Sequence, residues 1–181
     1  TAGVLITAFL TCIFCFYVLK FTLFDSLLIG CVISPTDAAS VFSILRSKNL
    51  SLKDGTASML ELESGSNDPA AFMITMIVLN YMNGQVAAAG IGYMVFAQIV
   101  FGVLIGVGIA LIAIFALNKL NIVTNGLETI FMIAVVLTSY ALSEYFGGNG
   151  YLSVYLTGII LGNAHIKSKI ILVHFFDGVT G

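Results

Sequence analysis

The amino-acid sequence predicts an all-α fold, a polytopic bundle of hydrophobic helices in a lipid bilayer. Hydrophobic residues make up 59% of the 181-residue chain, charged residues only 9%, and the mean hydropathy is +1.08. A typical soluble domain carries about 25% charged residues, so a soluble domain and a disordered chain are both excluded. The net charge of −2 also leaves no basic surface for nucleic acid.

A bilayer-spanning helix needs about 17–25 predominantly apolar residues, and six segments of the sequence meet that requirement. They are residues 3–19, 26–45, 56–82, 91–117, 126–146 and 149–166. A soluble protein built from such segments, joined by loops this short, would have no polar surface. The chain begins without Met and stops where a further segment begins, so we expect an internal fragment of a longer, transporter-sized protein.

The basic residues orient these segments in the membrane. With one exception they fall in alternate loops, as Arg46, Lys48, Lys53, Lys119, Lys167 and Lys169. Loops rich in Lys and Arg stay on the cytoplasmic side, so we expect the N-terminal end of the chain to lie in the cytoplasm. The exception, Lys20, is expected to extend its long side chain to the opposite interface.

The second segment is interrupted by Ser34-Pro35-Thr36-Asp37. Pro35 cannot donate a backbone hydrogen bond and clashes with the preceding helical turn, so backbone carbonyls are freed at membrane depth. With the hydroxyls of Ser34 and Thr36 and the carboxylate of Asp37, these carbonyls are hard oxygen ligands that suit an alkali cation. A simple proline kink, with Thr36 bonded to its own helix, explains this motif alone equally well.

The third segment carries acidic groups that cannot face lipid. Ser64, Asn67 and Asp68 fall at positions i, i+3 and i+4 of a helix and share one face, and Pro69 is expected to break the helix. An ionisable group at membrane depth costs about 2.5–3.5 kcal/mol on insertion scales. The chain supplies no basic partner at the depth of Asp68, so we predict that Asp68 binds a cation or a proton.

The two glutamates of this segment have a different expected role. Glu61 is expected near the cytoplasmic interface, and Glu63 is expected to be a structural carboxylate paired with a basic residue. Neither is assigned to the ion.

The remaining motifs predict no catalytic chemistry, so the protein is not expected to be an enzyme. Cys12-x-x-Cys15 has the spacing of a redox or metal pair, but no second ligand pair follows it, and these cysteines are predicted to be small buried hydrophobes. No cofactor is expected. The G-x-x-x-G pattern of Gly102 and Gly106 suits either a dimer contact or helix packing within the chain.

Both interrupted segments resemble the bacterial NhaP-like family of monovalent cation/proton antiporters, and its potassium/proton branch most closely. The resemblance rests on Ser34-Pro35-Thr36-Asp37-Ala38-Ala39 and on Glu63-Ser64-Gly65-Ser66-Asn67-Asp68-Pro69. It extends to the stretch from Gly150 to Gly158, to Leu161-Gly162-Asn163 and to Phe175-Phe176-Asp177-Gly178. It therefore covers nearly the whole chain.

This resemblance implies a larger homodimeric protein of the bacterial cytoplasmic membrane, with a mobile core and a dimerisation domain. The core would consist of two inverted three-helix repeats with proline-broken helices. Residues 1–83 would form one such repeat, and residues 84–181 would be helices of the dimerisation domain. Glu63 would pair with an arginine of a later helix.

Residue by residue, the resemblance also implies a site. Asp68 matches the aspartate that binds the cation and the proton, and Ser64 and the Thr36 carbonyl match cation ligands. Asn67 matches a position that is Asn in electroneutral members of the family. Asp37 matches the acid of the crossing motif.

The resulting hypothesis is a transporter in which K⁺ or Na⁺ competes with H⁺ for Asp68. The empty, ionised site would be a charge in a poor solvent. The core would therefore change its access from one side of the membrane to the other only when a cation or a proton neutralises the site, and this restriction yields exchange. About one proton should move per cation, because Asn67 is not a second acid. Two alternatives remain open, a cation channel and a structural or sensory membrane subunit, and Asp68→Asn distinguishes the structural alternative.

Overall fold

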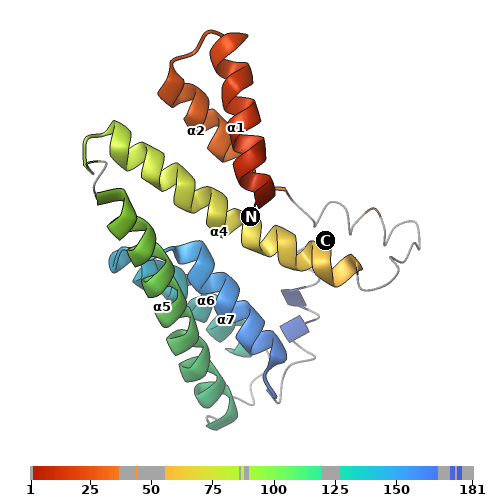
Figure 1. Cartoon of the computed structure of the whole chain (residues 1–181). Helices are drawn as coiled ribbons and strands as arrows, with labels where there is room; N and C mark the ends of the chain where they lie inside the picture. Colours follow the sequence, from red (N-terminus) through yellow and green to blue (C-terminus); the bar gives the residue numbers. More distant parts are fainter. Residues whose placement is uncertain are drawn as a thin grey trace. The chain divides into compact units, whose positions relative to one another are not determined.

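The computed structural model is all-helical in the part of the chain that it describes, residues 2–36, 44, 56–85, 87, 90–119, 127–166, 172–173 and 175–176. Figure 1 shows its helices, which in chain order are α1 (Ala2–Tyr17), α2 (Leu23–Ile33), α4 (Thr56–Met82), α5 (Ile91–Lys119), α6 (Leu127–Tyr145) and α7 (Gly150–Asn163). The predicted all-α fold is confirmed.

The chain divides into two compact units, Thr1–Phe96 and Ala97–Gly181. The first unit contains α1, α2 and α4, and the second contains most of α5 together with α6 and α7. The division falls inside α5, whereas the boundary expected from the sequence lies in the loop that precedes this helix.

Two of the described helices, α5 and α6, are long and apolar enough to cross a membrane by length and composition alone. α1 and α2 are apolar but shorter. α2 is short because the helix ends at Ile33. Pro35 has no backbone N–H to donate to the Cys31 carbonyl, which accepts a hydrogen bond from the Ser34 hydroxyl instead. Within the described residues, helix length and composition by themselves therefore support two of the six expected spans.

In the first unit, α1 and α2 pack against each other as a helical hairpin. The connection contains Lys20 in the left-handed region, with a φ of 59°. Thr22 then caps α2, because its Oγ1 accepts a 3.2 Å hydrogen bond from the backbone N–H of Asp25. Where the helices cross, Gly30 lies directly against α1, and a Cβ atom on Gly30 would overlap the carbonyl oxygen of Ala8.

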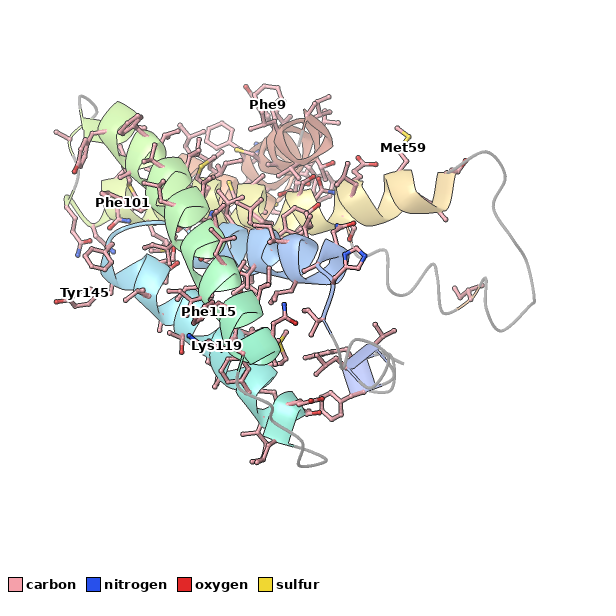
Figure 2. All side chains as sticks on the ribbon, turned by 90° about the horizontal axis from the view of Figure 1, so that it is seen from below. Phe9, Met59, Phe101, Phe115, Lys119 and Tyr145 are labelled. Atoms are coloured by element: carbon pink, nitrogen blue, oxygen red, sulfur yellow. The ribbon has the colours of Figure 1, made fainter. Side chains whose placement is uncertain are left out.

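α4 packs on α2 and completes the core of the first unit. Ala8 of α1, Cys31 of α2 and Val78 of α4 are buried together in this core. Cys12 and Cys15 are also buried and carry free thiols, which agrees with their prediction as small hydrophobes. The opposite face of α1 is exposed and apolar, and Figure 2 shows Phe9, which is 63% exposed, pointing away from α4.

The predicted helix break at Pro69 is wrong, because α4 continues from Thr56 to Met82 with Pro69 in its interior. A proline removes only the bond to the carbonyl four residues earlier, here that of Gly65, and crowds that carbonyl. Pro69 has more than two helical turns of α4 on each side of it, so the helix bridges the missing bond.

In the second unit, α5 packs against the beginning of α7 through its G-x-x-x-G pattern. A Cβ on Gly102 would lie 3.1 Å from the carbonyl oxygen of Asn149, and one on Gly106 would lie 2.6 Å from that of Ser153. The motif is thus used for helix packing within the chain.

Buried hydroxyl groups link α5, α6 and α7. Ser139 Oγ of α6 lies 2.8 Å from Ser153 Oγ and 3.0 Å from Thr157 Oγ1, both on α7. Thr157 Oγ1 also lies 3.0 Å from the Gly106 carbonyl oxygen of α5, to which it can donate. Hydrogen bonds of this kind join helices where the surroundings are apolar.

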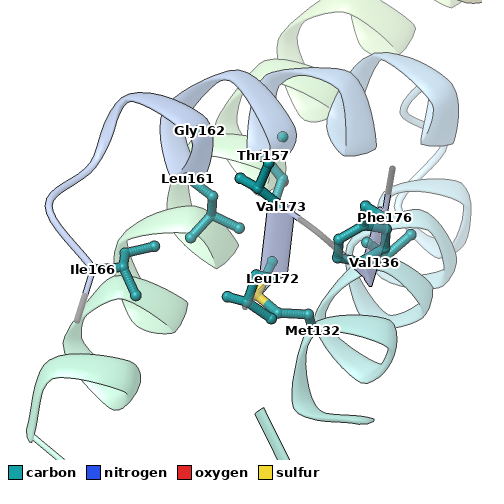
Figure 3. A pocket seen from close by; sticks show the side chains of 10 residues that line it. Met132, Val136, Thr157, Leu161, Gly162, Ile166, Leu172, Val173 and Phe176 are labelled. Carbon is teal, nitrogen blue, oxygen red and sulfur yellow. The ribbon is translucent and has the colours of Figure 1, made fainter. Parts of the chain in front are cut away.

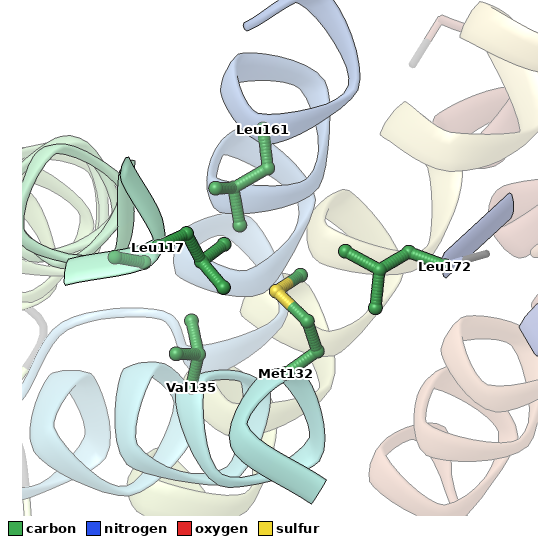
Figure 4. Close-up of a cluster of buried hydrophobic side chains, with 6 residues drawn as sticks. Leu117, Met132, Val135, Leu161 and Leu172 are labelled. Carbon is green, nitrogen blue, oxygen red and sulfur yellow. The ribbon is translucent and has the colours of Figure 1, made fainter. Parts of the chain in front are cut away.

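An apolar core lies beyond this hydroxyl cluster, towards the end of α5 and the beginning of α6. Figure 4 shows its side chains converging from the three helices and from the segment that contains Leu172. They are Ala113, Leu117, Met132, Val135, Leu161 and Leu172.

Candidate ion-binding site

The candidate site begins where α2 ends. Ser34 is the C-terminal cap of this helix, and its buried hydroxyl donates a 2.8 Å hydrogen bond to the carbonyl of Cys31. Pro35 and Thr36 then continue outside the helix. Ser34 therefore bonds back to its own helix, and the backbone of Thr36 is released to make contacts elsewhere.

Thr36 makes these contacts with the middle of α4. Ser64 Oγ donates a 2.9 Å hydrogen bond to the Thr36 carbonyl oxygen, and Asn67 Nδ2 donates a 2.8 Å hydrogen bond to Thr36 Oγ1. Ser64 and Asn67 are one helical turn apart and project from the same face of α4. The two donors therefore hold both oxygens of a single residue.

Two residues of the helix face predicted from the sequence, Ser64 and Asn67, thus meet a common partner. Asn67 is only 3% exposed, and Pro69 is also buried. Asp68, between them, is exposed on the surface of the first unit. The structure brings together Thr36, Ser64 and Asn67, and Asp68 follows directly in the chain.

The structure gives less detail on the other acids discussed above, Glu63, Asp37 and Glu61. Glu63 is exposed on α4, and its Oε1 atom lies 3.8 Å from the position of a Cβ on Gly3, in the first turn of α1. Asp37 and the side chain of Glu61 lie outside the described residues.

The chemistry of the site is that of oxygen and amide groups. Among the described residues, no group of three or more His, Cys, Asp or Glu side chains is placed to hold a metal ion. A backbone carbonyl and two hydroxyls next to a carboxylate-bearing residue are hard ligands, which suit alkali cations rather than soft metals.

Sequence reasoning missed Gly30, which sets how closely α1 approaches the helix that leads to Thr36. A glycine inside an apolar helix was the available signal, because glycine costs helix stability unless close packing uses it. It also missed the pairing of Asn67 with Thr36, because a separation of 31 positions leaves no local pattern.

Comparison with known proteins shows the family to which the chain belongs. Residues 1–177 match the family model described as "Sodium/hydrogen exchanger, transmembrane". The chain is 34% identical over 99% of its length to the K⁺/H⁺ antiporter NhaP of Alkalimonas amylolytica, and 33% identical over the same share to the K⁺/H⁺ antiporter NhaP2 of Shewanella oneidensis. It covers 31% of the length of each of these relatives.

The chain belongs to the sodium/hydrogen exchanger family of transmembrane proteins. The resemblance to NhaP-like antiporters inferred from the two interrupted segments is therefore confirmed.

Proposed function

We propose that this chain is part of a secondary active transporter that exchanges a monovalent cation, K⁺ or Na⁺, for H⁺ across the bacterial cytoplasmic membrane. The observation that carries the proposal is that Ser64 and Asn67 both bond to Thr36. Asn67 directly precedes Asp68 in the chain. The family and the names of the relatives support it. Because the chain spans about a third of those relatives, the activity is proposed for the full-length protein.

The cation would bind at the oxygens that now share a hydrogen bond. Ser64 Oγ–H points to the Thr36 carbonyl oxygen across 2.9 Å. When a cation enters, rotation of the Ser64 hydroxyl hydrogen away from this carbonyl would turn both oxygens towards the ion. The carboxylate of Asp68 would then supply the compensating negative charge.

The proton would compete for the same carboxylate. An ionised carboxylate in a poorly solvating environment is costly, so the site favours either a bound cation or a bound proton. If the core changes its access only in these neutral forms, a cation moving one way is balanced by a proton moving the other way. Asn67 adds no second charge, so one proton per cation and electroneutral exchange are expected.

We assign the first unit to the moving core and the second to a dimerisation domain of a homodimer. The exposed apolar face of α1 and the apolar length of α5 and α6 suit contact with the lipid bilayer. In this proposal Glu63 is a structural carboxylate, Asp37 contributes to the crossing region, and the cation and the proton are substrates and not resident cofactors.

The decisive experiment uses the full-length parent protein in everted membrane vesicles with an acid interior. Addition of K⁺ or Na⁺ should dissipate the pH gradient for the unmodified protein, and Asp68→Asn should abolish this response. Comparing the two salts at equal concentration ranks the ions. Asp25→Asn is the matched control, because Asp25 is an exposed acid that belongs to the cap of α2.

Three outcomes would contradict the proposal. Exchange that survives Asp68→Asn would remove the carboxylate from the mechanism. Cation flux that follows voltage without coupling to the pH gradient would indicate a channel. A folded, inserted protein that gives no response over a range of pH would favour a structural or sensory subunit.

A further inference from the structure

The second unit contains an apolar cavity of about 330 Å³ between α6, α7 and the segment that contains Leu172 and Phe176. Figure 3 shows Met132 and Val136 on one side of it and Leu161 and Gly162 on another. Ligand pockets in proteins are clefts of about 300–1,000 Å³ lined mainly by apolar side chains, so this cavity has the size and lining of a site for an apolar group.

Two glycines of α7 shape the cavity. Gly158 and Gly162 are one helical turn apart and line the cavity. No described residue outside their own stretch of helix comes within 4 Å of the position where a Cβ would stand. Gly102 and Gly106 of α5 differ, because α7 backbone lies against both. Gly158 and Gly162 are also exposed, so the cavity is accessible from the surface of the unit along this side of α7.

The described walls of the cavity offer few partners to a polar occupant. Among the described residues that line the cavity, Thr157 is the one with a polar side chain, and it is only 1% exposed. Its hydroxyl already lies within hydrogen-bond distance of the Gly106 carbonyl, the Ser153 carbonyl and Ser139 Oγ. Its hydroxyl hydrogen therefore has acceptors within the unit, and a water molecule, which needs two to four polar partners, would find few among the described lining residues.

We propose that this cavity binds an acyl chain of a membrane phospholipid, lying along Gly158 and Gly162 of α7. A hydrocarbon chain is the occupant that needs no hydrogen bond and fills a narrow apolar slot. The family to which the chain belongs is transmembrane, so acyl chains surround it at high concentration. The proposal requires only that the protein lies in a membrane, and it does not depend on cation exchange.

The test uses the full-length protein in liposomes that contain a phospholipid with a photoreactive diazirine near the end of one acyl chain. After illumination, cross-linked peptides are mapped by mass spectrometry. We expect cross-links at residues 132–136 and 158–162. The double variant Gly158→Leu/Gly162→Leu fills the slot and should lose these cross-links, while labelling of the exposed face of α1 persists.

Gly108→Leu is the matched control, because Gly108 of α5 also has open space at its Cβ position but does not line the cavity. It should keep the cross-links. If size-exclusion chromatography shows that the double variant does not fold, Gly162→Ala, which adds one methyl group, should still reduce labelling at residues 158–162. Wild-type labelling of α1 without labelling of α6 and α7 would overturn the proposal, as would labelling that filling the slot does not change.

Discussion

Asn67 Nδ2 donates a 2.8 Å hydrogen bond to Thr36 Oγ1 and so joins the middle of α4 to the segment that follows α2. The direction of this bond has a consequence for residue choice at position 67. An ionised Asp at this position has no donor, so it could only accept a hydrogen bond from the Thr36 hydroxyl. The amide therefore holds Thr36 without adding a charge next to Asp68.

Asn67→Ala should destabilise the protein by about 0.5–1.5 kcal/mol, because it removes the donor of a part-buried hydrogen bond. The measurement is the thermal unfolding temperature of the purified full-length protein. Asn80→Ala is the matched control, because Asn80 also lies on α4 but its Nδ2 donates only to the Met76 carbonyl of the same helix. Equal losses for the two variants would show that the Thr36 contact has no special weight.

Ser64→Ala should reduce the free energy of cation binding more than it reduces the free energy of unfolding. It removes one proposed ligand and also the hydroxyl that positions the Thr36 carbonyl. Loss of a hydrogen-bonding partner of a charged group costs about 1.5–3 kcal/mol, so the cation concentration for half-maximal exchange should rise about tenfold or more.

Ser66→Ala provides the comparison for this variant, since Ser66 Oγ donates to the Glu63 carbonyl within α4. Its half-maximal cation concentration should stay close to that of the unmodified protein. If Ser64→Ala leaves this concentration unchanged as well, Ser64 is not a ligand, and its bond to Thr36 is purely structural.

Local constraints explain which features could be predicted from the sequence. The bounds of α4 match the predicted segment, because a long run of helix-compatible residues ends in the Asn83-Gly84 turn. The end of α2 could be predicted because Pro35 has no backbone N–H with which to continue the helix. Pro69 was misjudged by the same rule, since a single missing hydrogen bond does not end a helix that is long on both sides.

Tertiary contacts explain what could not be predicted. The resemblance to the antiporter family implied that Thr36 and Ser64 belong to one site. Their hydrogen bond to each other, and that of Asn67 to Thr36 Oγ1, depend on how α2 lies against α4, and helical periodicity in one segment does not determine the partner of its polar face. The hydroxyl cluster of Ser139 and Thr157 was missed for the same reason, although a serine or threonine in an apolar helix is a signal for bonding between helices.

Gly30→Ala should destabilise the first unit by about 1–3 kcal/mol, the range for inserting atoms into a packed interface. The added Cβ would overlap the Ala8 carbonyl oxygen, so α1 and α2 would have to separate. Gly92→Ala, at a helix position with open space around its Cβ, should be neutral or slightly stabilising because alanine favours helix. The unfolding temperatures of both variants test the difference, and a neutral Gly30→Ala would mean that the helices do not cross here.

The hydroxyl cluster of the second unit allows a test of coupling between helices. Ser139→Ala and Thr157→Val each remove one side of a 3.0 Å contact between α6 and α7, and their combination completes a double-mutant cycle. Thr157→Val also removes the donor to the Gly106 carbonyl, so it should be the more costly single change.

The expected coupling energy is about 0.6 kcal/mol and no more than about 1.7 kcal/mol, the range measured for hydrogen bonds between membrane helices. Unfolding of the full-length protein in detergent micelles by a chemical denaturant measures it. Pairing Ser139→Ala with Thr75→Val gives the reference, because Thr75 of the first unit bonds only to the Ala71 carbonyl of its own helix, and these two changes should be additive. Additivity within the Ser139 and Thr157 pair as well would mean that α6 and α7 are held by their apolar contacts alone.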